Sequence, residues 1–163
     1  MELLPLLQEK LAGATRVAIL GVGSELRADD VAGILVAQEC EKIHKAENFK
    51  VFYGYTAPEN ITGEIRKFSP SHLIIIDAAD TSDTPGTISF INPDDIAGIS
   101  FSTHMIPLKI LVDYITADTK CQIAIIGIQP QTLTFGQAVT PAISATTTEL
   151  ATGLISTITK IMV

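Results

Sequence analysis

The stretch Val17-Ala-Ile-Leu-Gly-Val-Gly-Ser-Glu-Leu-Arg-Ala-Asp-Asp-Val-Ala-Gly33 decides how this chain folds. Residues 17–20 form an apolar run rich in β-branched residues, which predicts a buried strand. Gly21 and Gly23 then turn the backbone, and apolar residues recur at helical spacing from Val31 onward. A strand, a tight loop and a helix in this order place the loop at the carboxyl end of a strand, where open α/β sheets bind ligands.

The same loop lacks the residues that bind nucleotides. A dinucleotide fingerprint needs a third glycine at the position of Leu26. A P-loop needs a Gly-Lys-Ser or Gly-Lys-Thr ending, where this chain has Arg27-Ala-Asp-Asp30. Two carboxylates would also repel a phosphate at the start of the following helix. The loop is therefore better suited to a cation or to a polar neutral group.

The composition limits the class of protein and its partners. With 163 residues, 47% of them hydrophobic and 18% charged, the chain is predicted to be a single folded domain over residues 1–163. A net charge of −7 without a basic stripe argues against a nucleic-acid partner. The amino terminus does not resemble a signal peptide and no apolar run reaches about 20 residues, so we expect a cytoplasmic protein without membrane insertion. Cys40 and Cys121 form no Cys-x-x-Cys motif, which argues against a zinc knuckle or a dithiol redox site.

Apolar patterns in the rest of the chain predict alternating strands and helices. Leu73-Ile-Ile-Ile-Asp77 is the clearest central strand and carries an acid at its carboxyl end. Further strands are predicted at 49–55, 87–91 and 122–127, and helices at 3–11, 108–115 and 141–160. This alternation predicts an α/β fold, a single-domain three-layer αβα sandwich around a twisted, mainly parallel sheet.

Three side chains are candidates for chemistry at one edge of this sheet. Asp30 follows the first strand, Asp77 ends the central strand, and His104 precedes a later helix. Because the carboxyl ends of parallel strands share one edge, these side chains could converge, and two carboxylates with an imidazole suit a divalent metal such as nickel or zinc. Asp77 could instead brace a turn at 78–82, Asp30 could cap the following helix, and a lone histidine near a helix start is often structural. Asp29 is expected to be the capping member of the acidic pair.

Five segments, in this order along the chain, resemble [NiFe]-hydrogenase maturation endopeptidases. They are residues 21–30, 56–60, 74–78, 102–108 and 127–130. The Thr-Ala-Pro-Glu-Asn and Gly-Ile-Gln-Pro segments resemble the branch that serves hydrogenase 3, the HycI-like branch. Five ordered segments are far more specific than any one of them alone.

The resemblance implies a function and the residues that carry it. These enzymes remove a carboxyl-terminal extension from the precursor of the hydrogenase large subunit after nickel insertion, and their fold is a three-layer αβα sandwich. Their metal-contacting residues match Asp30, Asp77 and His104, which the resemblance makes both catalytic and metal-contacting here. The nickel belongs to the precursor, so we expect no permanently bound cofactor, and we expect a monomer. Aspartic-type and metal-assisted hydrolysis both stay open.

The first loop also departs from the family pattern. Ser24 stands where the family usually has asparagine, and Ala28 and Val31 stand where it frequently has glycine, which puts loop conformation and substrate fit in question. Two other functions stay open. A non-enzymatic nickel-binding assembly factor could use the same three ligands. A small-molecule enzyme or nucleotide-binding α/β domain is disfavoured by the missing glycine and lysine.

Overall fold

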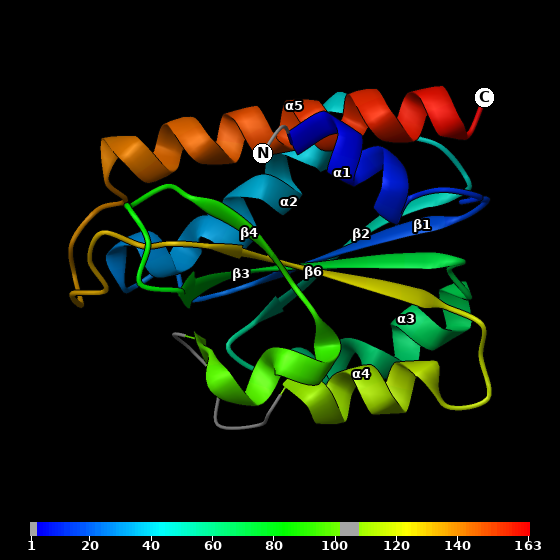
Figure 1. Cartoon of the computed structure of the whole chain (residues 1–163), viewed down its shortest axis with the longest axis horizontal. Helices are drawn as coiled ribbons and strands as arrows, with labels where there is room; N and C mark the ends of the chain where they lie inside the picture. The colour runs from blue at the N-terminus through cyan, green and yellow to red at the C-terminus, as the bar shows by residue number, and fades with distance from the viewer. Residues whose placement is uncertain (1–2, 102–107) are drawn as a thin grey trace.

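The computed structural model describes residues 3–101 and 108–163, built around one sheet (Figure 1). The strand order is β2-β1-β3-β6-β4, with β5 paired to β3 outside this path. The strands are β1 (Val17–Val22), β2 (Phe49–Tyr55), β3 (His72–Asp80), β4 (Ile88–Ile91), β5 (Ser100–Phe101) and β6 (Gln122–Ile128). β1, β2, β3 and β6 run parallel, whereas β4 is antiparallel to β6 and β5 is antiparallel to β3. The sheet is therefore mainly parallel, as the alternating pattern predicts.

Helices cover both faces of this sheet (Figure 1). One face is covered by α1 (Leu3–Lys10), α2 (Ala32–Ile43) and α5 (Pro141–Ile161), and the other by α3 (Thr62–Phe68) and α4 (Leu108–Thr116). Short 3-10 helices lie in the connections: η1 (Ala28–Val31), η2 (Pro58–Ile61) and η3 (Pro93–Gly98). The predicted three-layer αβα sandwich is confirmed. In the part of the chain that the structure describes, no helix is both long enough and apolar enough to cross a membrane.

The central strand β3 is buried on both faces, which explains its unbroken apolar run. Side chains alternate along a strand, so Ile74 and Ile76 pack on the side of α1, α2 and α5. Leu73 and Ile75 pack on the side of α3 and α4. All four are at most 1% exposed, and burying a side chain of this size contributes about 1.5–3 kcal/mol. β3 therefore gives a rigid support to any polar residue that it carries.

β3 extends three residues further than its apolar pattern predicts. The prediction that this strand ends at Asp77 is wrong, because β3 continues to Asp80. β6 pairs with β3 beyond Asp77, and β5 pairs with the last two residues of β3, so these ladders keep the chain extended. Residues 78–80 are thus strand and not turn. The turn that follows is braced by Asp80, whose Oδ1 accepts a hydrogen bond from Ser82 N (3.0 Å).

Candidate functional site

Asp30 lies in η1, directly after the loop that leaves β1. Gly23 shapes this loop, because its φ of +144° is a conformation that residues with a Cβ rarely adopt, and a Cβ there would overlap the carbonyl oxygen of Asp30. The Asp30 side chain is fully buried, and its Oδ2 accepts a hydrogen bond from Ser24 N (3.3 Å). The N-cap residue of α2 is Val31, so Asp30 does not occupy the capping position. Its carboxylate instead faces the loop at the carboxyl end of β1.

Asp77 lies in β3, between β1 and β6, at the carboxyl end of the parallel sheet. It pairs with Gly127 of β6, and its side chain is fully buried. By alternation it shares the face of Leu73 and Ile75, which α3 and α4 cover. The central strand therefore carries a buried acid three residues before its end.

Close packing of α2 on the strand ends brings η1 to β3. A Cβ at Gly33 would overlap the carbonyl oxygens of Ile76 and Val22, so the first turn of α2 lies directly on the carboxyl ends of β3 and β1. η1 immediately precedes this turn and contacts β3. Asp30 and Asp77 therefore lie on neighbouring segments at the same edge of the sheet, and both are excluded from water.

His104, the third candidate, lies outside the described residues, and its place in the site stays a prediction. The described residues on either side are Phe101, at the end of β5, and Leu108, at the start of α4. Both pack with the same apolar cluster as Ile75, on the face of the sheet to which Asp77 belongs. Within the described part of the chain, no three His, Cys, Asp or Glu side chains are grouped as a metal site requires.

The neighbouring acid, Asp29, holds a distant loop in place. Its fully buried carboxylate accepts hydrogen bonds from Gln131 N (2.8 Å), Thr132 N (3.1 Å) and Thr140 N (2.7 Å). The Thr140 hydroxyl also donates to it, at 2.9 Å from Oδ1. The prediction that Asp29 caps a helix is therefore wrong. It anchors the loop between β6 and α5, whose donors lie 102 to 111 residues away in sequence.

Gln129, directly after β6, is a positioning residue that the sequence candidates do not include. Its Oε1 accepts hydrogen bonds from Thr81 N (2.8 Å) and Asp83 N (3.3 Å). Its Nε2 donates to Asp80 Oδ1 (3.3 Å). One buried amide therefore fixes the loop that follows β3, at the edge of the sheet where the two acids lie. The sequence signal for it is a polar residue that directly follows an apolar strand.

Ala28 and Ser24, two of the substituted positions of the first loop, differ in how well they fit the observed backbone. Ala28 has a φ of +51°, a left-handed conformation that glycine adopts without the steric strain of a Cβ. A glycine at this position would therefore be less strained than Ala28. The Ser24 hydroxyl accepts a hydrogen bond from Leu26 N (3.1 Å), an interaction that an asparagine oxygen can also make.

Neither cysteine is suited to nucleophilic catalysis. Burial raises the pKa of Cys40 to about 12, and the charge of the neighbouring Glu39 acts in the same direction. Burial also raises the pKa of Cys121 to about 11. Both thiols stay protonated at neutral pH, whereas the thiolate is the form that attacks.

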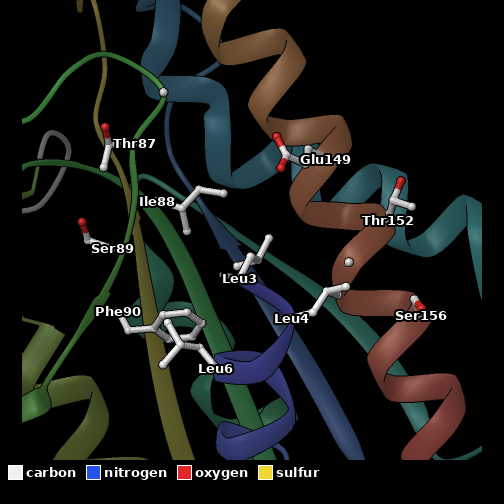
Figure 2. A pocket seen from close by; sticks show the side chains of 12 residues that line it. Leu3, Leu4, Leu6, Thr87, Ile88, Ser89, Phe90, Glu149, Thr152 and Ser156 are labelled. Carbon is white, nitrogen blue, oxygen red and sulfur yellow. The ribbon is translucent and has the colours of Figure 1, made fainter. Parts of the chain in front are cut away.

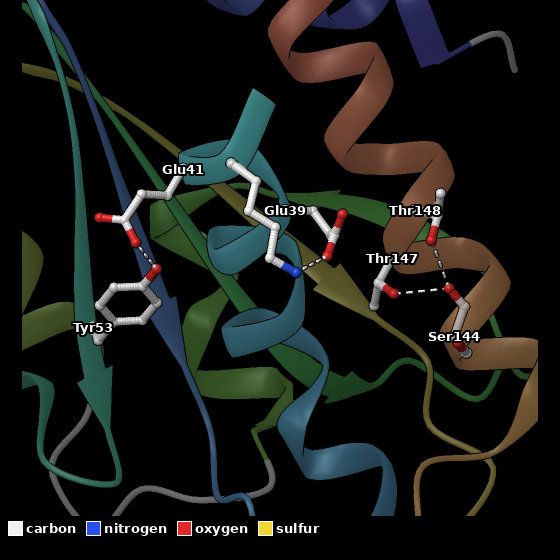
Figure 3. Close-up of polar contacts among 7 residues, drawn as sticks. Glu39, Glu41, Tyr53, Ser144, Thr147 and Thr148 are labelled. Atoms are coloured by element: carbon white, nitrogen blue, oxygen red, sulfur yellow. Dashed lines mark hydrogen bonds and ion pairs between the residues drawn. The ribbon is translucent and has the colours of Figure 1, made fainter. Parts of the chain in front are cut away.

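Polar contacts around the last turns of α2 are structural (Figure 3). Tyr53 OH donates a hydrogen bond to Glu41 Oε2 (2.7 Å), and burial, followed by this bond, raises the pKa of Tyr53 above its ordinary value. Lys42 Nζ pairs with Glu39 Oε1 (2.7 Å) on the exposed surface. These groups lie at the end of α2 opposite to η1.

A cavity of about 950 Å³ lies away from the two acids (Figure 2). Side chains of α1, β4 and α5 line it, and Leu3, Leu4 and Ile88 face the same space. Its described lining includes one carboxylate, Glu149, and no histidine. The described lining of this cavity contains neither Asp30 nor Asp77.

Known proteins are similar to this chain over most of its length. The family model of hydrogenase maturation proteases (HycI) matches residues 34–159, a range that contains Asp77 and His104 and begins after Asp30. The hydrogenase 3 maturation protease of Escherichia coli K12 is 40% identical over 118 residues, which cover 72% of this chain and 74% of that protein.

Solved structures share the fold as well. The crystal structure of a [NiFe] hydrogenase maturation protease HycI from Thermococcus kodakarensis KOD1 has a TM-score of 0.88 and 28% identity, covering 94% of this chain and 99% of that chain. The solution structure of an endopeptidase HycI from Escherichia coli has a TM-score of 0.77 and 36% identity, covering 86% of this chain and 90% of that chain. The likeness therefore includes the sheet and both helical layers.

Proposed function

This chain belongs to the HycI-type family of hydrogenase maturation proteases, and we propose that it removes the carboxyl-terminal extension of a [NiFe]-hydrogenase large-subunit precursor after nickel insertion. The observation that supports this most is the pair of fully buried acids, Asp30 and Asp77, at one edge of a parallel sheet. In this proposal the precursor is the partner, its nickel is the group that the acids recognise, and the enzyme is a cytoplasmic monomer without a permanently bound cofactor.

Two buried carboxylates suit contact with a divalent cation. A cation beside them offsets the free energy that burying a carboxylate costs. His104 supplies the third ligand in this proposal, because an imidazole nitrogen suits nickel. Since the nickel arrives with the precursor, the three side chains position the adjacent peptide bond and do not need to hold a resident ion. A precursor without nickel lacks the group that they contact, so the same contacts select the nickel-loaded precursor.

Hydrolysis then requires an activated water. The water oxygen bonds to the carbonyl carbon, the C–N bond breaks, and the proton taken from the water passes to the leaving amine. In the aspartic-type route an ionised Asp30 or Asp77 takes that proton directly. In the metal-assisted route the precursor's nickel first lowers the pKa of the water. Both routes use the same two carboxylates.

Intact-mass analysis of a nickel-loaded large-subunit precursor incubated with this protein tests the proposal. We expect loss of a carboxyl-terminal peptide with the wild type, and no loss from nickel-free precursor. Asp30→Asn and Asp77→Asn keep the side-chain volume and should slow cleavage at least about 100-fold, the scale of a lost general acid–base group. Asp113→Asn is the matched control, because the Asp113 carboxylate is exposed and pairs with Lys109 at 3.4 Å. This control should cleave at the wild-type rate.

Each arm of this experiment has an outcome that contradicts one part of the proposal. Equal cleavage of nickel-free precursor would exclude nickel as the recognition element. Full activity of folded Asp30→Asn and Asp77→Asn would remove both acids from the mechanism. His104→Ala should fold and process poorly, so normal processing by a soluble variant would remove His104 from the site. Tight nickel binding by the isolated protein without any cleavage would support the non-enzymatic assembly role.

A further inference from the structure

Two large apolar side chains are exposed at the same sheet edge as the two acids. Leu26, in the loop between β1 and η1, is 63% exposed, and Phe135, in the loop between β6 and α5, is 73% exposed. Both loops follow the carboxyl ends of parallel strands, and the second is drawn at the left of Figure 1. Single exposed apolar side chains are common in folded proteins, whereas apolar side chains that lie together on the surface point to a binding site.

Hydrogen bonds join the backbones of the two loops that carry Leu26 and Phe135. Residues 134–137 form a turn closed by a hydrogen bond from Gln137 N to Thr134 O (3.3 Å). A φ of +82° at Gly136 fits the third position of a type II turn, which leaves Phe135 at the tip. Gly136 N also donates to Leu26 O (2.8 Å), and this bond joins the turn to the first loop.

Asp29 connects this arrangement to the candidate catalytic acid. Its buried carboxylate anchors the loop that carries Phe135, and Asp30 is the next residue in η1. The order of both loops is therefore built into the free protein. A partner that docks here does not need to order them, which lowers the free-energy cost of binding.

We propose that Leu26 and Phe135 form an apolar docking ledge for the precursor polypeptide, where they contact apolar side chains that flank the cleaved bond. This inference rests on the proposed function, because the continuity of the ledge with Asp30 identifies the occupant. A peptide bond held at Asp30 has neighbours about 3.3–3.6 Å further along an extended chain for each residue. In this proposal those neighbours extend toward Leu26, which lies four positions before Asp30 and whose carbonyl oxygen accepts a hydrogen bond from the turn of Phe135.

A second copy of this chain is a poorer occupant. Each copy carries a net charge of −7, so two copies repel each other. A stable interface buries about 1,200–2,000 Å² in total, which is far more than two side chains can cover. Transient contact with a substrate needs only a few apolar anchors.

Steady-state cleavage of the nickel-loaded precursor, together with its direct binding, tests the ledge. Leu26→Ser and Phe135→Ser change exposed side chains, so both variants should fold. We expect each to raise KM about tenfold, the scale of a lost interface anchor, with kcat unchanged because neither side chain reaches the reacting bond. Ile43→Ser is the matched control, because Ile43 is 52% exposed and lies at the opposite edge of the sheet. Its neighbour His44 contacts Phe49, at the start of β2, with the two ring centroids 5.0 Å apart.

The outcomes separate the ledge from the proposed function. Unchanged KM and precursor affinity in the Leu26→Ser/Phe135→Ser double variant would overturn the ledge, as would an equal loss in Ile43→Ser. A lower kcat at constant KM would overturn it too, because these residues would then position the acid and not bind substrate. If light scattering showed that the wild type is a dimer and the double variant a monomer, this face would be an interface between two copies of the chain, and the ledge would be overturned. Wild-type binding without cleavage would contradict the proposed function, yet loss of that binding in the double variant would still support the ledge. Absence of both binding and cleavage would overturn both.

Discussion

Asp29→Asn replaces the carboxylate that anchors the loop between β6 and α5 by an amide of nearly the same size. In the native protein Oδ1 accepts from Thr140 N, and Oδ2 accepts from Gln131 N and Thr132 N. The Thr140 hydroxyl lies 2.9 Å from Oδ1 and 3.0 Å from Oδ2. An amide has one acceptor oxygen and one donor nitrogen. One of these two groups of backbone donors must therefore face the amide nitrogen, which cannot accept a hydrogen bond. The substitution therefore changes hydrogen bonding while packing stays almost unchanged.

The expected loss follows from the better of the two amide orientations. With the NH2 group toward Thr140, the Thr140 hydroxyl can turn and accept, and a single backbone N–H loses its partner. A buried donor left in this way costs about 1–3 kcal/mol, and the remaining bonds weaken because their acceptor is no longer charged. We expect a total loss of about 2–3 kcal/mol, a large share of the roughly 5–15 kcal/mol that stabilises a domain.

Urea unfolding and amide hydrogen exchange separate the global and the local effect. If the loop opens only when the whole domain unfolds, the free energy of unfolding measured in urea falls by the entire loss, about 2–3 kcal/mol. If the loop opens alone, the amides of Gln131, Thr132 and Thr140 exchange about 30- to 140-fold faster, because about 1.4 kcal/mol corresponds to a factor of ten. The urea midpoint would then change little.

Asp113→Asn is the control for the loss of one carboxylate. The Asp113 side chain is exposed, and its ion pair with Lys109 (3.4 Å) is of the kind that contributes about 1 kcal/mol or less. If Asp29→Asn matched Asp113→Asn both in urea stability and in exchange of the three loop amides, the buried carboxylate would not be the anchor. That result would refute the reasoning.

Backbone space, burial and amide hydrogen bonding each give a further prediction. Gly23→Ala should lower the free energy of unfolding in urea by more than about 2 kcal/mol, because the new Cβ would overlap the Asp30 carbonyl oxygen. Gly63→Ala should instead raise that free energy by about 0.4–1 kcal/mol, because the space around its Cβ is open. Burial lowers the pKa of His72, with a backbone hydrogen bond opposing the shift in part, so below about pH 6.5 the unfolded chain takes up a proton that the folded chain resists. The free energy of unfolding should therefore be highest above that pH and fall as the pH drops. In His72→Phe the free energy of unfolding in urea should change little between about pH 7.5 and pH 5.5. If it fell with pH as much in the variant as in the wild type, His72 would not be the cause. Gln129→Leu leaves two backbone N–H groups without their acceptor and should speed hydrogen exchange in the loop after β3 about tenfold or more, so unchanged exchange there would show that the amide does not hold the loop.

The part of the fold that sequence predicts is the part with a local pattern. Residues 17–20 are apolar and precede two glycines, and the structure has the expected strand (β1), loop and helix (α2) in this order. The sequence pattern does not predict the short helix η1 within that loop. The apolar runs at 73–77 and 122–127 correspond to β3 and β6 because strands covered by helices on both faces need side chains that suit burial on both. The same local order of segments identifies the protease family.

Features that depend on distant partners are the ones that sequence does not predict. β5 consists of Ser100 and Phe101 alone, which is too short to show a period of two. The end of β3 is set by its pairing with β5 and β6 and not by its own residues. Asp29 is mistaken for a cap for the same reason, since an aspartate before a helix looks identical whether it caps that helix or accepts from a loop more than 100 residues away.

The two neighbouring acids of η1 carry different tasks because they point in different directions. Successive residues of a 3-10 helix are about 120° apart around its axis, so Asp29 faces the loop of Phe135 while Asp30 faces Ser24. One short helical turn thus fixes both the candidate catalytic acid and the loop that presents the docking ledge. Loss of the Asp29 anchor should therefore raise KM and lower kcat together in steady-state cleavage of the precursor. Loss of Leu26 or Phe135 should raise KM alone, and this difference separates a residue that positions the site from residues that contact the substrate.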